Sequence, residues 1–392
     1  MCQRLYMGVN MRNLLFLIGI ILIFAFLVFS IFTRGQRKKI KAVRVIAAIL
    51  AIAALFCIWE FPAYAYPEPT GEFNVASVGC TYVDENRVEP YEDDGSARWL
   101  NVVFWYPENY IGDDHTCPLI VFSHGSFGIK ESNESLYREL ASHGYIVCAI
   151  DHTYQCLNTV GPDGKTVPMS GEYRKQIMAA SDSSEEGRQA LFFSFTEWMH
   201  VRMGDINFVL DTVIARSDAN DGGQNGVYLL ADTTKIGVMG HSLGGAAALG
   251  MGRVRGDVKA VIALEAPFMN DVHGVKGGAF VWEQSPYPVP LLSVYTDSSW
   301  DKLASLPQYA QNDAVLHDQC DTTYDLYVQG AGHMTLTDLA YSMPVLCLAF
   351  GQDMFFDIGG TLSRLNQSYL DFFDYYLKDD TQIDLNKNLG LI

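Results

Sequence analysis

Ser242 lies in the pentapeptide GHSLG, between a predicted strand over 236–239 and a predicted helix over 243–252. A serine on such a sharp strand-to-helix turn has a strained backbone, and bulky residues do not fit beside it. The two glycines of the pattern, Gly240 and Gly244, meet this requirement. The start of the helix also offers backbone N–H groups and a positive dipole end to negative charge that develops near the serine. The pattern therefore predicts a nucleophilic serine.

A serine hydroxyl is a weak nucleophile that needs a general base, and histidine is the commonest one. Three of the nine histidines follow Ser242 in the chain: His273, His317 and His333. His273 lies in a glycine-rich segment and His317 precedes the last predicted strand, whereas His333 follows that strand in the sequence GAGHMTLTDLA. Active sites of open α/β sheets lie at the carboxyl ends of the strands. His333 is therefore the predicted base.

Two carboxylates could orient this histidine and stabilise its protonated form. Glu265 ends a predicted strand 23 residues after Ser242, in apolar surroundings where a carboxylate is costly unless it is paired. Asp297 ends the next predicted strand, 55 residues after Ser242, and lies nearer the usual position of the acid in such a sheet. From these spacings alone, both residues remain candidates.

An oxyanion-binding loop is predicted at residues 121–128, which read VFSHGSFG. Enzymes with a nucleophile on a strand-to-helix turn keep one oxyanion-binding amide in the loop after an early strand and a second amide directly after the nucleophile. We assign these backbone N–H groups to Ser126 and Leu243. Only the direction of each N–H matters for this role, so the side chains are free to vary.

The elements around these residues are short apolar strands that alternate with helices. This alternation predicts an α/β domain with a mostly parallel sheet covered by helices on both faces. We expect one catalytic domain over 98–392, with cap-like insertions at about 153–196 and 270–288. Strands are predicted at 99–106, 118–123, 145–150, 236–239, 258–264, 291–295 and 324–328, and helices at 133–143, 197–215, 243–252 and 361–378.

The first 61 residues are expected to be a membrane anchor. Residues 14–32 are uncharged and apolar, and nineteen such residues are long enough to cross a bilayer. A second span is expected at about 45–61, or else the core of an internal signal that is cleaved near Ala65. The loop 33–44 between them carries six Lys or Arg and no acid, which favours a cytoplasmic loop. After a linker and extension over 62–97, the catalytic domain would lie on the extracytoplasmic side of the cytoplasmic membrane.

The charge divides along the chain in the same way. The 392 residues carry a net charge of −18, but residues 1–61 hold eight basic and one acidic residue, and the remainder holds nineteen basic and 44 acidic ones. Such an acidic domain argues against nucleic acid as a partner and leaves membrane contact to the anchor or to apolar loops.

No cofactor or metal is expected from the motifs. The sequence has neither a CxxC nor an HExxH motif, and the loop DANDGGQNG at 218–226 lacks the spacing of a calcium-binding EF-hand. Six of the eight cysteines fall in the exported part, where disulfides are permitted, but their spacing does not define a pairing.

Several segments carry a family resemblance: 122–125 (FSHG), 142–147 (SHGYIV), 240–245 (GHSLGG) and 262–265 (IALE), together with His152. With these motifs, the sequence resembles the platelet-activating-factor acetylhydrolases of the plasma, lipoprotein-associated phospholipase type, within the α/β-hydrolase superfamily. The likeness runs from about residue 98 to 340. Around residue 242 the chain is also similar to bacterial polyester and cutin hydrolases.

The resemblance has implications for the site residues. The acid of that family ends the strand after the nucleophile helix, which is the position of Glu265, although the family residue is Asp. His333 matches the family's base, and Ser126 and Leu243 match its oxyanion amides. The family implies calcium-independent hydrolysis of short or oxidised acyl groups from phospholipids. The two N-terminal apolar segments are not a feature of the plasma enzyme.

The residues and the resemblance together predict a membrane-anchored serine hydrolase that cleaves carboxylic esters, including lipid esters, through an acyl-enzyme. An acyltransferase or a peptidase with the same triad is the catalytic alternative. A non-catalytic anchored binding module is the third reading. A fluorophosphonate probe would separate the two catalytic readings from the third.

Overall fold

A computed structural model describes residues 11–33, 37–61, 64–108, 110, 115–180, 184–317 and 322–380. The chain forms two compact units. The first, here the helical unit, comprises Met1–Pro67 and Gly330–Ser363. The second, here the sheet unit, comprises Glu68–Gln329 and Arg364–Ile392.

The sheet unit is built on an eight-stranded sheet with the order β1-β2-β4-β3-β7-β8-β11-β12. β2 pairs antiparallel with β1 and with β4, and all the other pairs are parallel. The prediction of a mostly parallel α/β sheet is thereby confirmed. The strands are β1 (Val75–Val88), β2 (Ala97–Pro107), β3 (Cys117–Ser123), β4 (Ile146–Asp151), β7 (Ala231–His241), β8 (Val258–Leu264), β11 (Leu291–Thr296) and β12 (Thr323–Val328).

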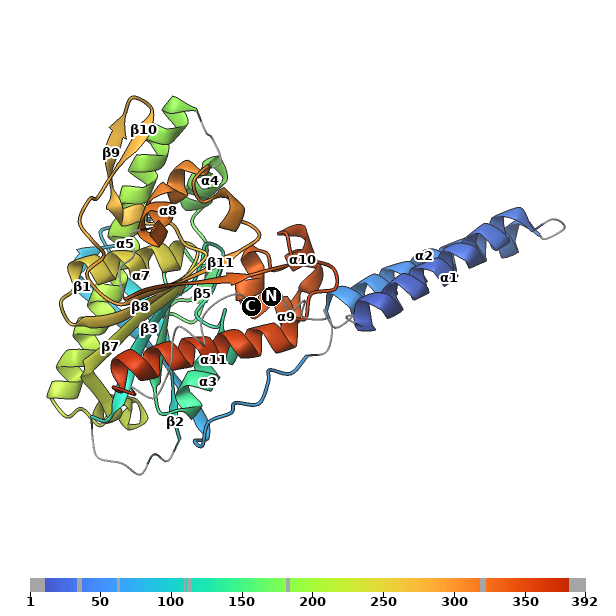
Figure 1. Cartoon of the computed structure of the whole chain (residues 1–392). Coiled ribbons are helices and arrows are strands. Elements are labelled where there is room, and N and C mark those ends of the chain that lie inside the picture. Colours follow the sequence, from blue (N-terminus) through green and yellow to red (C-terminus); the bar gives the residue numbers. More distant parts are fainter. Residues whose placement is uncertain are drawn as a thin grey trace, which may run out of the picture. The chain divides into compact units, whose positions relative to one another are not determined.

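Helices cover both faces of this sheet (Figure 1). α5 (Glu185–Asp218) and α7 (Leu243–Val254) lie on one side, and α3 (Glu134–Ser142) and α11 (Ile358–Leu377) lie on the other. The inner strands are enclosed between these layers, and every residue of β3 and of β4 is buried. This burial explains why these strands are continuous apolar runs rather than alternating ones.

The two predicted insertions contain regular structure. The first holds a hairpin of β5 (Asn158–Val160) and β6 (Thr166–Pro168), then α4 (Gly171–Ala179). It leads into α5, which starts before the predicted residue 197 because Ser184 caps it, its Oγ accepting the Gly187 N–H at 2.9 Å. The second insertion is a hairpin of β9 (Val272–Lys276) and β10 (Ala279–Trp282). Smaller helices are α6 (Val227–Leu230) and α8 (Ala310–His317).

The helical unit contains two apolar helices, α1 (Met11–Phe32) and α2 (Lys38–Glu60), each long and apolar enough to cross a membrane. They form an antiparallel pair, since the start of α1 meets the end of α2. Trp59 Nε1 donates to Asn13 Oδ1 at 2.8 Å, and the Trp59 ring stacks on Phe16 with 3.9 Å between ring centroids. Most of their other side chains are exposed, as expected for helices that face lipid.

The rest of the helical unit is a run of short helices: η5 (His333–Leu336), α9 (Leu339–Ser342) and α10 (Pro344–Ala349). Two hydrogen bonds join these helices and the segment that follows them to α1 and α2. Glu60 Oε2 accepts the Val345 N–H at 3.0 Å, and Asn13 Nδ2 donates to the Met354 carbonyl. The part of the helical unit that carries His333 is therefore bonded to the start of α1 and to the end of α2.

Candidate active site

Ser242 occupies the turn between β7 and α7. Its φ of 53° lies in the left-handed region, which is rare for a residue other than glycine and marks a strained backbone. The Ser242 N–H donates to the Leu264 carbonyl at 2.8 Å, which ties the turn to the end of β8. The side chain is partly exposed. The chain thus has the sharp, accessible turn that the sequence pattern predicts, while the nucleophilic role of Ser242 stays a prediction.

The glycines beside Ser242 are required by close backbone contacts. A Cβ on Gly240 would lie 2.4 Å from the Gly244 carbonyl, and a Cβ on Gly244 would lie 2.0 Å from the Ser123 carbonyl. Real side chains do not approach backbone this closely, so neither position accepts a larger residue. The second contact also shows that the start of α7 packs directly on the end of β3.

The loop after β3 meets the same turn. A Cβ on Gly125 would lie 3.2 Å from Ser242 Cβ, so the loop backbone is in contact with the candidate nucleophile. The Gly128 N–H donates to the Gly125 carbonyl at 3.1 Å, which closes a four-residue turn with Phe127 at a φ of 64°. Ser126 stands inside this turn, and its Oγ lies 3.1 Å from the Tyr173 hydroxyl of α4. Strain again coincides with the candidate site.

Glu265 directly follows β8 and is fully buried, with a φ of 48°. Its Oε2 accepts the Thr296 N–H at 2.6 Å, whereas Oε1 has no hydrogen-bond partner among the described residues. Burial raises the pKa of Glu265 from 4.5 to about 7, against the lowering effect of its hydrogen bonds. A buried carboxylate oxygen without a partner is costly, and such atoms occur at functional sites.

Asp297, the other candidate acid, directly follows β11 and is exposed. Its Oδ1 accepts the Tyr327 hydroxyl at 2.6 Å. The two candidates therefore differ in environment. Glu265 is buried, and one of its oxygens has no partner among the described residues, whereas Asp297 is exposed to solvent. This contrast favours Glu265 as the orienting acid, because a buried carboxylate interacts more strongly with an imidazolium.

His333 is the first residue of η5, five positions after the end of β12, and is partly buried. Desolvation lowers its pKa to about 4, so the ring is neutral and able to act as a base. It belongs to the helical unit, whereas Ser242 and Glu265 belong to the sheet unit. Of the other two candidates, His273 is exposed on β9 and pairs with Glu283 at 3.1 Å, and His317 ends α8 with its side chain outside the described residues.

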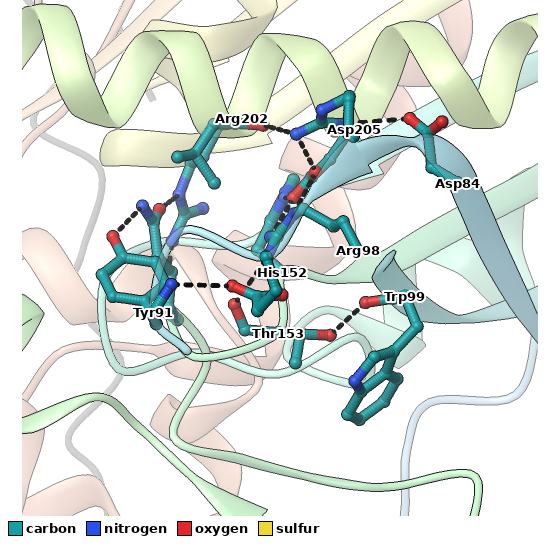
Figure 2. Close-up of polar contacts among 12 residues, drawn as sticks. Asp84, Tyr91, Arg98, Trp99, His152, Thr153, Arg202 and Asp205 are labelled. Atoms are coloured by element: carbon teal, nitrogen blue, oxygen red, sulfur yellow. Dashed lines mark hydrogen bonds and ion pairs between the residues drawn. The ribbon is translucent and has the colours of Figure 1, made fainter. Parts of the chain in front are cut away.

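A second set of polar residues, fully buried, joins α5 to β2 and to the end of β4 (Figure 2). Ser123 Oγ lies 2.8 Å from His152 Nε2, and His152 Nδ1 lies 2.9 Å from Asp205 Oδ2. This order of Ser, His and Asp is that of a catalytic triad. Sequence reasoning missed Asp205, its ion-pair partner Arg98 and Arg202, which lies 3.4 Å from Ser123 Oγ. The signal for them was present, since a charged residue inside an apolar strand or helix face must be paired in the core.

One buried group has the composition of a metal site. Ligand atoms of His124, Asp151 and Cys156 lie within 4.8 Å of one another. Asp151, however, already accepts the Lys130 ammonium at 2.9 Å and the Thr159 hydroxyl at 2.7 Å. Burial raises the pKa of the Cys156 thiol well above its usual range, which opposes the thiolate that a metal needs. With Asp151 and both ring nitrogens of His124 engaged by protein groups and the thiol kept protonated, the three residues do not fit an ion.

Comparisons with known proteins agree with this fold. A model of the family described as platelet-activating factor acetylhydrolase, isoform II, matches residues 107–162. The chain is 25% identical over 204 residues to a probable 1-alkyl-2-acetylglycerophosphocholine esterase of Arthroderma benhamiae, covering 50% of this chain and 44% of that protein. It is 26% identical over 204 residues to the cutinase est2 of Thermobifida alba, covering 52% of this chain and 50% of that protein. The chain thus matches about half the length of these curated relatives.

A solved structure of a ferulic acid esterase from Streptomyces cinnamoneus is similar with a TM-score of 0.58 and 21% sequence identity, over 81% of this chain and 95% of that one. The chain therefore has the α/β-hydrolase fold. Over about half of its length its sequence is similar to these esterases, and residues 107–162 resemble the platelet-activating-factor acetylhydrolases.

Proposed function

We propose that this protein is a membrane-anchored serine hydrolase that cleaves carboxylic esters, with Ser242 as nucleophile, His333 as base and Glu265 as the orienting acid. The observation that carries the proposal is the strained, partly exposed turn at Ser242, packed against a second strained turn at 125–128. Two such turns in contact, at the carboxyl ends of parallel strands, provide a nucleophile and oxyanion-binding amides together.

The reaction follows from these roles. Ser242 Oγ attacks the ester carbonyl carbon while His333 takes the hydroxyl proton, and the carbonyl oxygen becomes an oxyanion on the N–H groups of Ser126 and Leu243. The bond to the leaving alcohol then breaks, and His333 returns the proton to that oxygen. A water molecule attacks the acyl-enzyme as His333 removes its proton. The carboxylic acid departs and Ser242 regains its hydrogen.

Two observations support His333 and Glu265 in these roles. His333 follows Val328, the last residue of β12, by five positions, so its Cα is confined to within about 18 Å of that strand end. β12 is the second neighbour of β8, at whose end Glu265 lies. Glu265 Oε1, which has no hydrogen-bond partner within the described part of the chain, is suited to accept the Nδ1–H of a catalytic imidazole. Such a bond would fix the tautomer of the imidazole and stabilise the imidazolium.

The substrate class is proposed from the relatives and the apolar helices. Their names describe a probable esterase of 1-alkyl-2-acetylglycerophosphocholine and a cutinase. Two helices able to cross a membrane would hold the enzyme at a bilayer, which favours short-acyl phospholipid or other lipid esters. The six basic residues of segment 33–44, which includes the first turns of α2, favour a cytoplasmic position for that segment and hence an extracytoplasmic sheet unit.

The proposal is tested by labelling and turnover of the purified full-length protein in detergent. A fluorophosphonate should modify the peptide that contains Ser242, and Ser242→Ala should lose both the label and the hydrolysis of p-nitrophenyl acetate. Ser123→Ala is the matched control, because Ser123 has the triad-like contacts but no exposed surface. Labelling of Ser123, or full turnover in Ser242→Ala, would contradict the proposal. Acyl transfer to an added alcohol in place of hydrolysis would indicate a transferase.

A further inference from the structure

The fully buried polar residues around Asp205 form one connected cluster, here called the buried network. All of its members are 1% exposed or less. It joins four separate elements of the sheet unit: β2, the ends of β3 and β4, and α5 (Figure 2). The members are Glu89, Arg98, Ser123, His124, His152, Gln155, Arg202 and Asp205.

Asp205 is the central anion of the network. Its Oδ1 accepts Arg98 Nε at 2.7 Å and Arg87 Nη2 at 2.8 Å, and its Oδ2 accepts Arg98 Nη2 at 2.6 Å and His152 Nδ1 at 2.9 Å. Arg98 also donates to Glu89 Oε2 at 2.8 Å. Burial alone would raise the pKa of Asp205, but its ion pair with Arg98 holds that pKa well below the usual range. The carboxylate therefore stays ionised and acts only as an acceptor.

The ionised Asp205 determines the tautomer of His152. Because Asp205 can only accept, His152 Nδ1 donates to it, and burial lowers the pKa of His152 to about 4, which keeps the ring neutral. His152 Nε2 is then an acceptor, so the Ser123 hydroxyl donates to it. Substrate has no access to this serine, since Ser123, His152 and Asp205 have no exposed surface. The triad-like set is structural rather than a second nucleophilic site.

Arg202 connects the network to the candidate oxyanion loop. Its Nη1 donates to the His124 carbonyl and lies 3.4 Å from Ser123 Oγ. Its Nε donates to Gln155 Oε1 at 2.9 Å and its Nη2 to the Gln155 carbonyl at 3.3 Å. None of these acceptors is a carboxylate. Among the residues that the structure describes, Arg202 is held by neutral groups alone. A buried guanidinium in such surroundings is costly for folding, and such a cost is found where charge has a function.

His124 holds the next peptide of the loop. Its Nδ1 donates to the Gly125 carbonyl at 2.6 Å, and its Nε2 accepts the His152 N–H at 3.4 Å. In a trans peptide the C=O and the following N–H point in opposite directions. Fixing the Gly125 carbonyl on His124 and on the Gly128 N–H therefore fixes the direction of the Ser126 N–H, the assigned oxyanion donor.

We propose that Arg202 and His124 are positioning residues that orient the Ser126 N–H for oxyanion binding, with Asp205 and His152 as the buried support of that arrangement. This inference rests on the proposed function. Arg202 holds the peptide carbonyl of His124 and His124 holds that of Gly125, so two consecutive peptide planes are fixed beside Ser242. Without them the strained turn at Phe127 can relax to an ordinary conformation and turn the donor away.

The test compares Arg202→Met and Arg202→Lys in the full-length protein in detergent. Loss of one oxyanion donor costs about 10²–10³ in kcat, so Arg202→Met should lose about that factor in kcat on p-nitrophenyl acetate with KM little changed. Lys keeps the charge but not the planar fork, and should recover only part of the loss. Arg216→Met is the matched control on the same helix, because Arg216 packs over Tyr82 and Tyr228 instead of the loop, and it should keep wild-type kcat.

A transition-state analogue separates positioning from a purely structural role. A trifluoromethyl ketone forms a tetrahedral oxyanion on the serine, whereas the matching unfluorinated ketone binds without forming one. In Arg202→Met the affinity for the trifluoromethyl ketone should fall by the same factor as kcat. The affinity for the unfluorinated ketone should not change. His124→Asn, which can still donate to the Gly125 carbonyl, should keep more activity than His124→Ala.

Two results would overturn the inference. One is a wild-type kcat in Arg202→Met. The other is an equal loss of binding affinity for both ketones in a variant whose thermal unfolding midpoint is unchanged. If Arg202→Met does not fold, Arg202→Lys decides by the same two ketones. Failure of the proposed function itself is distinct, because the wild-type protein would then neither hydrolyse the ester nor bind the fluorinated ketone.

Discussion

Glu265→Gln should separate the structural cost of a buried carboxylate from its catalytic use. Burial raises the pKa of Glu265 from 4.5 to about 7, so between these values the folded protein holds a proton that the unfolded chain has lost. Stability therefore falls as pH rises through this window and stays reduced above it. The raised pKa corresponds to a loss of about 3 kcal/mol in the free energy of unfolding at pH 8. This is an upper limit, because pairing with His333 would reduce the loss. Gln carries no charge and keeps an acceptor for the Thr296 N–H.

The variant should accordingly unfold at a higher temperature than the wild type at pH 8, by roughly 5 °C, and at the same temperature near pH 4. Its kcat should fall by about 10³–10⁴, because an amide cannot stabilise the imidazolium. Asp297→Asn is the matched control and should change neither quantity, since Asp297 is exposed. The assays are p-nitrophenyl acetate turnover and fluorescence-detected unfolding of the full-length protein in detergent. The reasoning would be refuted by wild-type turnover in Glu265→Gln or by loss of turnover in Asp297→Asn. It would also be refuted if the rise in unfolding temperature of Glu265→Gln were the same at pH 4 and pH 8.

Three further outcomes are expected. Gly244→Ala should prevent folding, because the added Cβ would lie 2.0 Å from the Ser123 carbonyl. The control Gly256→Ala, whose Cβ would have nothing within 4 Å, should fold normally. Equal yields of folded protein by size exclusion would contradict this. The pH profile of kcat/KM should rise through about pH 7 as Glu265 ionises, since His333, with a pKa lowered to about 4, is already neutral there; a profile flat from pH 5 to 9 would argue against it. The full chain should resist carbonate extraction from membranes, and protease added to spheroplasts should digest the sheet unit; its protection would place that unit inside.

The candidate nucleophile and the turn that carries it are short-range features of the chain. Gly240 and Gly244 are demanded by contacts that a strand-to-helix turn always makes, so a pentapeptide is enough to predict them. The same holds for the apolar strands, whose burial on both faces leaves continuous hydrophobic runs. The length and composition of α1 and α2 are equally local properties.

The choice between Glu265 and Asp297 was not local. Both follow a parallel strand, and their spacing from Ser242 leaves either open. Only the packed structure distinguishes a buried carboxylate with one unpartnered oxygen from an exposed one bound by Tyr327. Burial depends on residues far along the chain, such as Tyr309, whose hydroxyl donates to the Glu265 carbonyl. Sequence spacing carries no information of that kind.

The sequence by itself determined the class of sheet, the apolar N-terminal helices and the order of the candidate nucleophile, acid and base, because periodicity, hydrophobic length and glycine requirements act over a few residues. Only the tertiary structure decided which polar groups are buried together. Arg98, Arg202 and Asp205 are separated by up to 107 positions along the chain, yet their charges share one buried cluster next to the candidate oxyanion loop. These charges must be paired because an unpaired charge in the core is costly. That cost arises only once distant segments have packed against one another.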